Sequence, residues 1–163
     1  MADVEGWRGR FLEDFRVGDR YRHAGGRTIS EADNTWFTLL TSNTHPIHVD
    51  AEYAAATEFG RPLVVSTLTL AIVTGLSVDD VSRNAVANLG WDDVRLTAPV
   101  FAGDTLHAES VVEEVRPSKS RPGQGVVRVM TRGYNQRGKE VIVFRRTILV
   151  YDRLSAPPAR AAE

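Results

Sequence analysis

The sequence contains no cysteine. Disulfides, thiolate catalysis and cysteine-ligated metal sites are therefore excluded, and a reducing compartment is compatible with this composition. The sequence also lacks an excess of either charge, because 20 Lys and Arg residues nearly balance 21 Asp and Glu residues, for a formal net charge of -1. Without a sequence-wide basic field, the chain is not expected to bind nucleic acid.

Long apolar segments are missing as well. The longest stretch without charge, Pro62 to Val78, is short for a bilayer span and carries five hydroxyl side chains, so we expect a buried helix and no membrane partner. The first ten residues are charged and contain no apolar core of the kind that secretory signals have. Together these features predict a cytoplasmic protein.

The overall composition is typical of one globular domain. With 163 residues, 42% of them hydrophobic, the chain is long enough to form a stable hydrophobic core without disulfides or a structural metal. We expect one domain over residues 1–153. The last ten residues, 154–163, are rich in small side chains and contain a Pro-Pro pair, which predicts a disordered C-terminal tail.

Three helices are predicted in the first half of the chain. Ser30 and Asp33 have the spacing of a capping box, which indicates a helix from about Glu31 to Leu40 with Trp36 in the core. Asp50 is expected to cap a short second helix over residues 51–58. The uncharged segment 65–76 predicts a third helix that is apolar on nearly all sides, so its neighbours are expected to wrap it.

The pattern changes to period two in the second half. Strands are expected over residues 84–95, with Trp91 in the core, and over 105–115, 124–134 and 140–151, after an edge strand within 11–28. Helices followed by antiparallel strands are typical of the α+β class. We therefore predict about five antiparallel strands curved around one central helix.

The strongest chemical signal is the turn from Thr41 to Asp50. It places the amide of Asn43, the imidazoles of His45 and His48, and a carboxylate within eight residues around a proline. Asp50 is more readily explained as a helix cap than as an acid or base. The His-x-x-His spacing lacks the Glu and the third ligand of a zinc helix, so no metal site is predicted.

This turn carries a family resemblance. The run Asn43-Thr-His-Pro-Ile-His-Val-Asp50, with the segments 59–70, 88–95 and 99–106, resembles the MaoC-like acyl-CoA dehydratases, also called (R)-specific enoyl-CoA hydratases. The Asn-Thr-His-Pro form is similar to the mesaconyl-CoA hydratase branch. The resemblance implies a hot-dog fold that pairs into a homodimer or larger homo-oligomer. It also implies a hydro-lyase without a cofactor, which adds or removes water across the 2,3 double bond of an acyl thioester.

The sequence departs from the family pattern at the catalytic pair. His48 matches the family histidine, but Asn43 stands where the family has Asp, and His45 stands where it has Asn. Because an amide cannot take a proton, three alternatives are open. His48 acts as base while Asn43 orients the water, His45 takes the missing role, or the site only binds thioesters. We favour the first.

Substrate contacts are expected at the start of the third helix. The backbone N–H groups of Val65, Ser66 and Thr67 are suited to bind the thioester oxygen, because the first amides of a helix have no intrahelical partner. Arg95, Arg61 and the basic connector Arg116–Arg121 are candidates for the phosphates of coenzyme A. Two other functions remain: a hot-dog thioesterase, or a noncatalytic thioester-binding subunit of a heteromeric dehydratase. The carrier, coenzyme A or acyl carrier protein, is left open.

Overall fold

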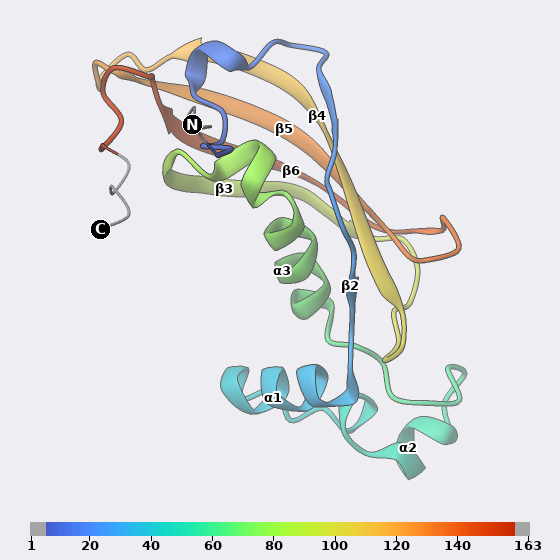
Figure 1. Cartoon of the computed structure of the whole chain (residues 1–163). Helices are drawn as coiled ribbons and strands as arrows, with labels where there is room; N and C mark the ends of the chain where they lie inside the picture. The colour runs from blue at the N-terminus through green and yellow to red at the C-terminus, as the bar shows by residue number, and fades with distance from the viewer. Residues whose placement is uncertain (1–5, 159–163) are drawn as a thin grey trace, which may run out of the picture.

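The computed structural model of the protein describes residues 6–158 (Figure 1). Its α-helices are α1 (Glu31–Thr41), α2 (Ala51–Ala55) and α3 (Ser66–Leu76). Three single turns accompany them: η1 (Leu12–Asp14), η2 (Pro46–His48) and η3 (Val78–Ser82). The strands are β1 (Arg20–Arg22), β2 (Arg27–Thr28), β3 (Ala85–Leu96), β4 (Thr105–Pro117), β5 (Gln124–Tyr134) and β6 (Glu140–Tyr151).

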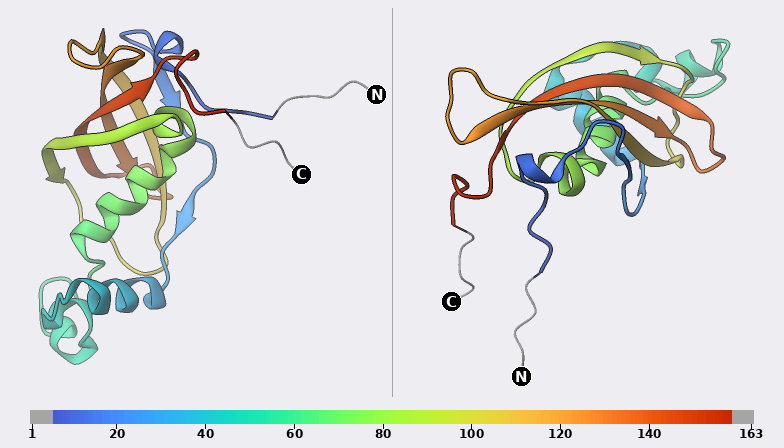
Figure 2. Two further views of the ribbon diagram at one scale, coloured as in Figure 1. Left: turned by 90° about the vertical axis from the view of Figure 1, so that its left-hand side faces the viewer. Right: turned by 90° about the horizontal axis from the view of Figure 1, so that it is seen from above.

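The strands form one antiparallel sheet in the order β1-β4-β5-β6-β3, and β2 pairs with β4 outside this path. The sheet arches over α3, while α1 and α2 lie beyond the N-terminal end of that helix (Figures 1 and 2). A single central helix under a curved antiparallel sheet is the hot-dog arrangement, so the predicted fold class is confirmed.

The main core lies between α3 and the concave face of the sheet. Val73 of α3 packs with a cluster that includes Leu106, Ile142 and Phe144, all of them buried. The close approach of helix and sheet depends on Gly133. A Cβ at this position would come within 2.6 Å of Val73 and 2.8 Å of Ile142, so a side chain here would push α3 away from β5.

A buried polar chain lies near the C-terminal end of α3. His23 Nδ1 is 2.9 Å from an Asp80 carboxylate oxygen, and His23 Nε2 is 2.8 Å from the Ser110 hydroxyl, which contacts the Thr131 hydroxyl. Because the carboxylate only accepts, Nδ1 of the neutral ring carries the proton and Ser110 donates to Nε2. This buried histidine therefore has a partner for each ring nitrogen. His107, the other histidine outside the turn, is exposed.

The third predicted helix is not wrapped on all sides. Leu68, Thr69 and Val73 are buried, whereas Thr67 and Ala71 on the opposite side of α3 are exposed. The sheet covers only one face of the helix. The expectation of a fully enclosed helix is therefore wrong for this chain alone.

The burial of α1 is the reverse of the prediction. Its buried residues are the polar Asn34 and Thr38, while Trp36 is 66% exposed and Leu39 and Leu40 also face outward. Trp91 on β3 is 45% exposed. The prediction that both tryptophans lie in the core is wrong: the hydrogen bonds of Asn34 turn α1 so that Trp36 faces outward, and Trp91 lies on the edge strand β3.

The residues predicted to cap the helices do so in the structure. Ser30 and Asp33 form the capping box of α1, and the Asp50 carboxylate accepts the N–H groups of Glu52 and Tyr53 at the start of α2. The second helix ends at Ala55, three residues earlier than predicted. In the predicted tail, Asp152 accepts the N–H groups of Ser155 and Ala156, and residues 159–163 lie outside the described part. No helix in residues 6–158 has the length and hydrophobicity needed to cross a membrane.

Candidate active site

The turn that carries the predicted catalytic residues is built by local capping. His45 is the N-cap of η2, and Pro46 occupies its first position, where a missing N–H costs nothing. His48 closes the same short turn. The sequence thus brings both imidazoles to one side of a single turn, with ring centroids 6.0 Å apart.

His48 is held by one hydrogen bond that fixes its proton. Its Nδ1 lies 2.9 Å from the carbonyl oxygen of Leu63. Because a carbonyl oxygen only accepts, Nδ1 carries the hydrogen and donates it, and Nε2 of the neutral ring keeps a free lone pair. His48 is therefore arranged as a base at Nε2.

His45 has the opposite arrangement. Its Nδ1 accepts the backbone N–H of Ile47 at 3.2 Å, so the neutral ring carries its hydrogen on Nε2. The side chain is exposed, and its ring lies 6.2 Å from that of Tyr53. In this form His45 is a hydrogen-bond donor toward solvent and cannot accept a proton at Nε2.

Two hydrogen bonds hold Asn43 in the turn, and Asn43 does not line the cavity that lies beside His48. Its backbone N–H donates to the Thr38 carbonyl at 3.0 Å, and its side-chain Oδ1 accepts the N–H of His45 at 3.3 Å. The second lone pair of Oδ1 and the Nδ2 hydrogens stay available to a water or a substrate.

A cavity of about 280 Å³ lies beside His48. Its lining residues come from α1, from η2 and the start of α2, from the segment before α3 and from the connection between β3 and β4: Glu31, Asn34, Thr35, His48, Val49, Ala51, Arg61, Pro62 and Ala102. The Arg61 guanidinium carbon lies 4.0 Å from the centroid of the Phe101 ring, which holds this cation at the cavity wall. The cavity combines one base, one cation, one amide and the Glu31 carboxylate.

Sequence reasoning missed Asn34. This α1 side chain is 5% exposed, and its amide makes hydrogen bonds to residues of two other segments that line the cavity. The available signal was the phase of the helix: Asn34 lies four residues after the Ser30 cap and four before Thr38, so these polar residues share one face.

The start of α3 offers fewer free amides than predicted. The Val65 N–H donates to the Asn34 side-chain oxygen at 2.9 Å, so it is not free for a substrate. Ser66 and Thr67 begin the helix, where no intrahelical acceptor exists, and both residues are exposed. The structure therefore reduces the predicted set of three N–H donors to these two.

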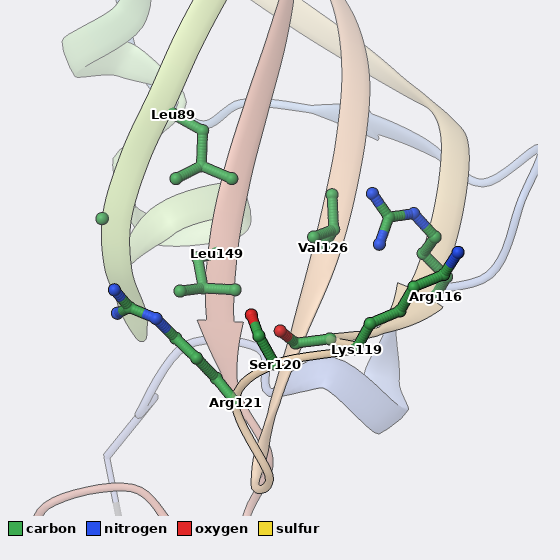
Figure 3. Close-up of a pocket in the computed structure, with 9 residues that line it drawn as sticks. Leu89, Arg116, Lys119, Ser120, Arg121, Val126 and Leu149 are labelled. Atoms are coloured by element: carbon green, nitrogen blue, oxygen red, sulfur yellow. The ribbon is translucent and has the colours of Figure 1, made fainter.

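Of the predicted coenzyme A contacts, Arg61 lines this cavity and the others lie apart from it. Arg95 is exposed near the end of β3, and the connector from Arg116 to Arg121 lines a depression of about 520 Å³ on the other face of the sheet from α3. Figure 3 shows Arg116 and Lys119 on one side of its apolar floor and Arg121 on the other. In Figure 1 this connector is at the far end of the sheet from α1. Within one chain, the structure does not bring it to His48.

Comparison with known proteins decides the family. Residues 13–135 match the family model described as "MaoC like domain". The chain belongs to the MaoC-like domain family. The mesaconyl-CoA hydratase of Cereibacter sphaeroides is 40% identical to this MaoC-like chain over 153 residues, which is 94% of the chain and 44% of that protein.

Solved structures agree with this assignment. The crystal structure of a MaoC domain dehydratase from Chloroflexus aurantiacus matches with a TM-score of 0.88 at 34% identity, over 99% of this chain and 46% of that one. A Mycobacterium tuberculosis protein described as having a double hotdog fold matches with a TM-score of 0.81 at 21% identity, over 93% of this chain and 47% of that one. This MaoC-like chain thus spans about half the length of the curated relatives that it matches first.

Metal ligands are not grouped in this site. Within residues 6–158, no cluster of three or more His, Asp or Glu side chains has the arrangement needed to hold a metal ion.

Proposed function

We propose that this MaoC-like chain is a hydro-lyase that adds water to, or removes it from, an enoyl or 3-hydroxyacyl thioester of coenzyme A. The observation that carries the proposal is the geometry of His48, whose Nδ1–H is fixed on Leu63 and whose Nε2 is left as a base. The name of the Cereibacter relative supports a short, C2-branched substrate such as mesaconyl-CoA. A cavity of about 280 Å³ fits a short acyl group.

In the hydration direction, Nε2 of His48 removes a proton from water as the water oxygen bonds to C3 of the enoyl group. The electron pair of the double bond moves toward the thioester carbonyl, and the resulting enolate oxygen is stabilised by the N–H groups of Ser66 and Thr67. His48 then returns the proton to C2. We propose that Asn43, which cannot exchange a proton and does not line the cavity, orients the water from the turn through its free Nδ2 hydrogens.

We also propose that the active form is a homodimer joined through β3 and the open face of α3. β3 is one of the two edge strands of the sheet, and its side chains Leu89, Trp91, Val94 and Leu96 are exposed. An edge strand with exposed apolar side chains, beside an uncovered helix face, is a surface suited to association with a second chain. The curated relatives, of which this chain spans 44% and 43%, support the same pairing, because their remaining half has room for a second hot-dog unit.

A thioesterase is the second candidate, because the carboxylate of Glu31 lines the same cavity as His48. The purified chain should be incubated with crotonyl-CoA and with mesaconyl-CoA, while the enoyl absorbance and the free thiol are followed together. Loss of the enoyl absorbance without thiol supports the hydro-lyase. Thiol release shows a thioesterase, and binding without either change shows a noncatalytic subunit.

A further inference from the structure

Both ends of the Asn34 side-chain amide are hydrogen-bonded, at a position where α1 would ordinarily bury a hydrophobic side chain. Its Nδ2 donates to the carbonyl oxygens of His48 at 3.0 Å and Leu63 at 3.1 Å, and its Oδ1 accepts the Val65 N–H at 2.9 Å. A buried amide costs free energy unless its groups are paired, and here both Nδ2 hydrogens and Oδ1 are. One side chain therefore joins α1, η2 and the start of α3.

The first consequence concerns the proton on His48. The Leu63 carbonyl accepts two hydrogen bonds, one from Asn34 Nδ2 and one from His48 Nδ1. A carbonyl oxygen has two lone pairs, so both bonds can form together. Asn34 also holds the backbone of His48 itself. The amide thus fixes the acceptor and the ring that donates to it, which keeps the hydrogen on Nδ1 and the lone pair on Nε2.

The second consequence concerns the start of α3. Asn34 Oδ1 accepts the Val65 N–H, which stands immediately before the first residue of the helix. This bond occupies one candidate donor and fixes the direction of the next two N–H groups. The position of the helix start relative to His48 is therefore set by the same side chain that sets the His48 tautomer.

We propose that Asn34 is the positioning residue of this site, which holds the base and the N–H donors of α3 in one geometry. The inference rests on the proposed function for its kinetic consequence, but the effect on the His48 tautomer does not require a substrate. Asn34 is not assigned any proton transfer, because an amide does not titrate in the working range.

Two variants test the proposal. Asn34→Leu removes all three hydrogen bonds while keeping a similar volume. It is expected to lower kcat on the order of 10²-fold, the loss that follows from a small misplacement of catalytic groups, while KM changes far less. Asn34→Asp keeps an acceptor for Val65 but, when ionised, donates to neither carbonyl. Burial raises the pKa of such a carboxyl, and its protonated form restores one donated bond. The ratio of variant to parent kcat should therefore rise as the pH falls from about 8 to about 6.

The matched control is Thr38→Val, because Thr38 is buried on the same face of α1 and its hydroxyl bonds only within the helix. This variant should keep the parent kcat. The tautomer of His48 is read from its imidazole ¹⁵N shifts, with the resonances identified by their loss in His48→Gln. Parent and Thr38→Val should show hydrogen on Nδ1, and the two Asn34 variants should show a mixture.

The proposal is overturned if folded Asn34→Leu has the parent kcat, if Thr38→Val loses as much activity, or if His48 keeps one tautomer in both Asn34 variants. If Asn34→Leu does not fold, Asn34→Asp and its pH response decide. A parent chain that turns over no thioester refutes the proposed function, while the tautomer comparison still tests the role of Asn34.

Discussion

His45 and His48 are neighbouring histidines held in opposite tautomers. Nδ1 of His45 accepts a backbone N–H, whereas Nδ1 of His48 donates to a backbone carbonyl. With ring centroids 6.0 Å apart, they present a donor and a base from one turn. Of the three alternatives that the sequence left open, this geometry favours His48 as base, because neutral His45 has no free lone pair to offer.

His48→Gln should therefore lower kcat by roughly 10²–10⁴-fold with the fold retained, since this is the range for a positioned acid–base group. His45→Gln should lose less, because only a donor is removed. Steady-state hydration of crotonyl-CoA by both variants checks this, with circular dichroism as the control for folding. Equal losses in the two variants would instead indicate a mechanism shared by two histidines.

Asn43 allows a second test. Asn43→Ala removes the acceptor for the His45 N–H and the amide that orients water, so kcat should fall on the order of tenfold or more while substrate binding persists. Asn43→Asp keeps the acceptor and restores the carboxylate of the family pattern, so it should keep or raise kcat. Stability must be measured beside activity. Parent rates and parent stability in both variants would remove Asn43 from the site.

The basic connector predicts a difference between two substrates. In one chain the connector does not reach His48, so a phosphate role requires the proposed homodimer, with the connector of one chain serving the cavity of its partner. If Lys119 and Arg121 hold the phosphates of coenzyme A in this way, the double variant Lys119→Glu/Arg121→Glu should raise KM for crotonyl-CoA by about tenfold, which corresponds to about 1.4 kcal/mol. KM for crotonyl-pantetheine, which has no nucleotide, should not change. Arg137→Glu, which alters an exposed arginine in another loop, is the matched control. An unchanged KM for crotonyl-CoA would contradict the phosphate role.

The proposed homodimer is tested on the open face of α3. Ala71 is exposed in the single chain, so Ala71→Arg should fold but fail to associate. Light scattering should give about 36 kDa for the parent, twice the chain mass of 18.0 kDa, and the single-chain mass for the variant. Val17→Arg, at an exposed apolar residue of the N-terminal segment, should leave the mass unchanged. A parent of single-chain mass would refute the dimer.

Stability should fall in mild acid because of His23. Burial lowers the pKa of His23, and the charges of Arg146 and Arg10 act in the same direction, against the opposing effect of Asp80. The folded state therefore keeps the ring neutral at pH values where the unfolded chain protonates it. The unfolded chain binds more protons below the ordinary histidine pKa of about 6.5, so stability is complete above that value and is lost as the pH falls below it.

Asp80 adds to this loss at lower pH. Burial alone would raise the pKa of its carboxyl, but hydrogen bonds from His23 and Arg10 outweigh that effect and lower it. The measurement is the Tm at about pH 7.5 and about pH 5.5. His23→Gln should shrink the difference between the two values, and His107→Gln, at an exposed histidine, should not. A parent Tm that is equal at both pH values would contradict the assignment.

Features with local causes were predictable from the sequence. The Ser30 capping box, the Asp50 cap and the four long strands follow from short-range spacing, and the structure confirms them. The errors arose where distant residues decide. The hydrophobicity of Trp36 predicts a place in the core, but α1 is turned by the hydrogen bonds of Asn34 to His48 and Leu63, which lie 14 and 29 residues further along the chain. No local pattern contains that information.

The Leu63 carbonyl has a consequence for how such a site can be mapped. Its oxygen receives both Asn34 and His48, yet it belongs to the backbone and is present whatever side chain follows it. Alanine scanning would therefore not detect the role of position 63, and a substitution of its side chain would leave the carbonyl acceptor in place. Only chemistry that alters the main chain, such as an ester or thioamide introduced between residues 63 and 64, would expose it.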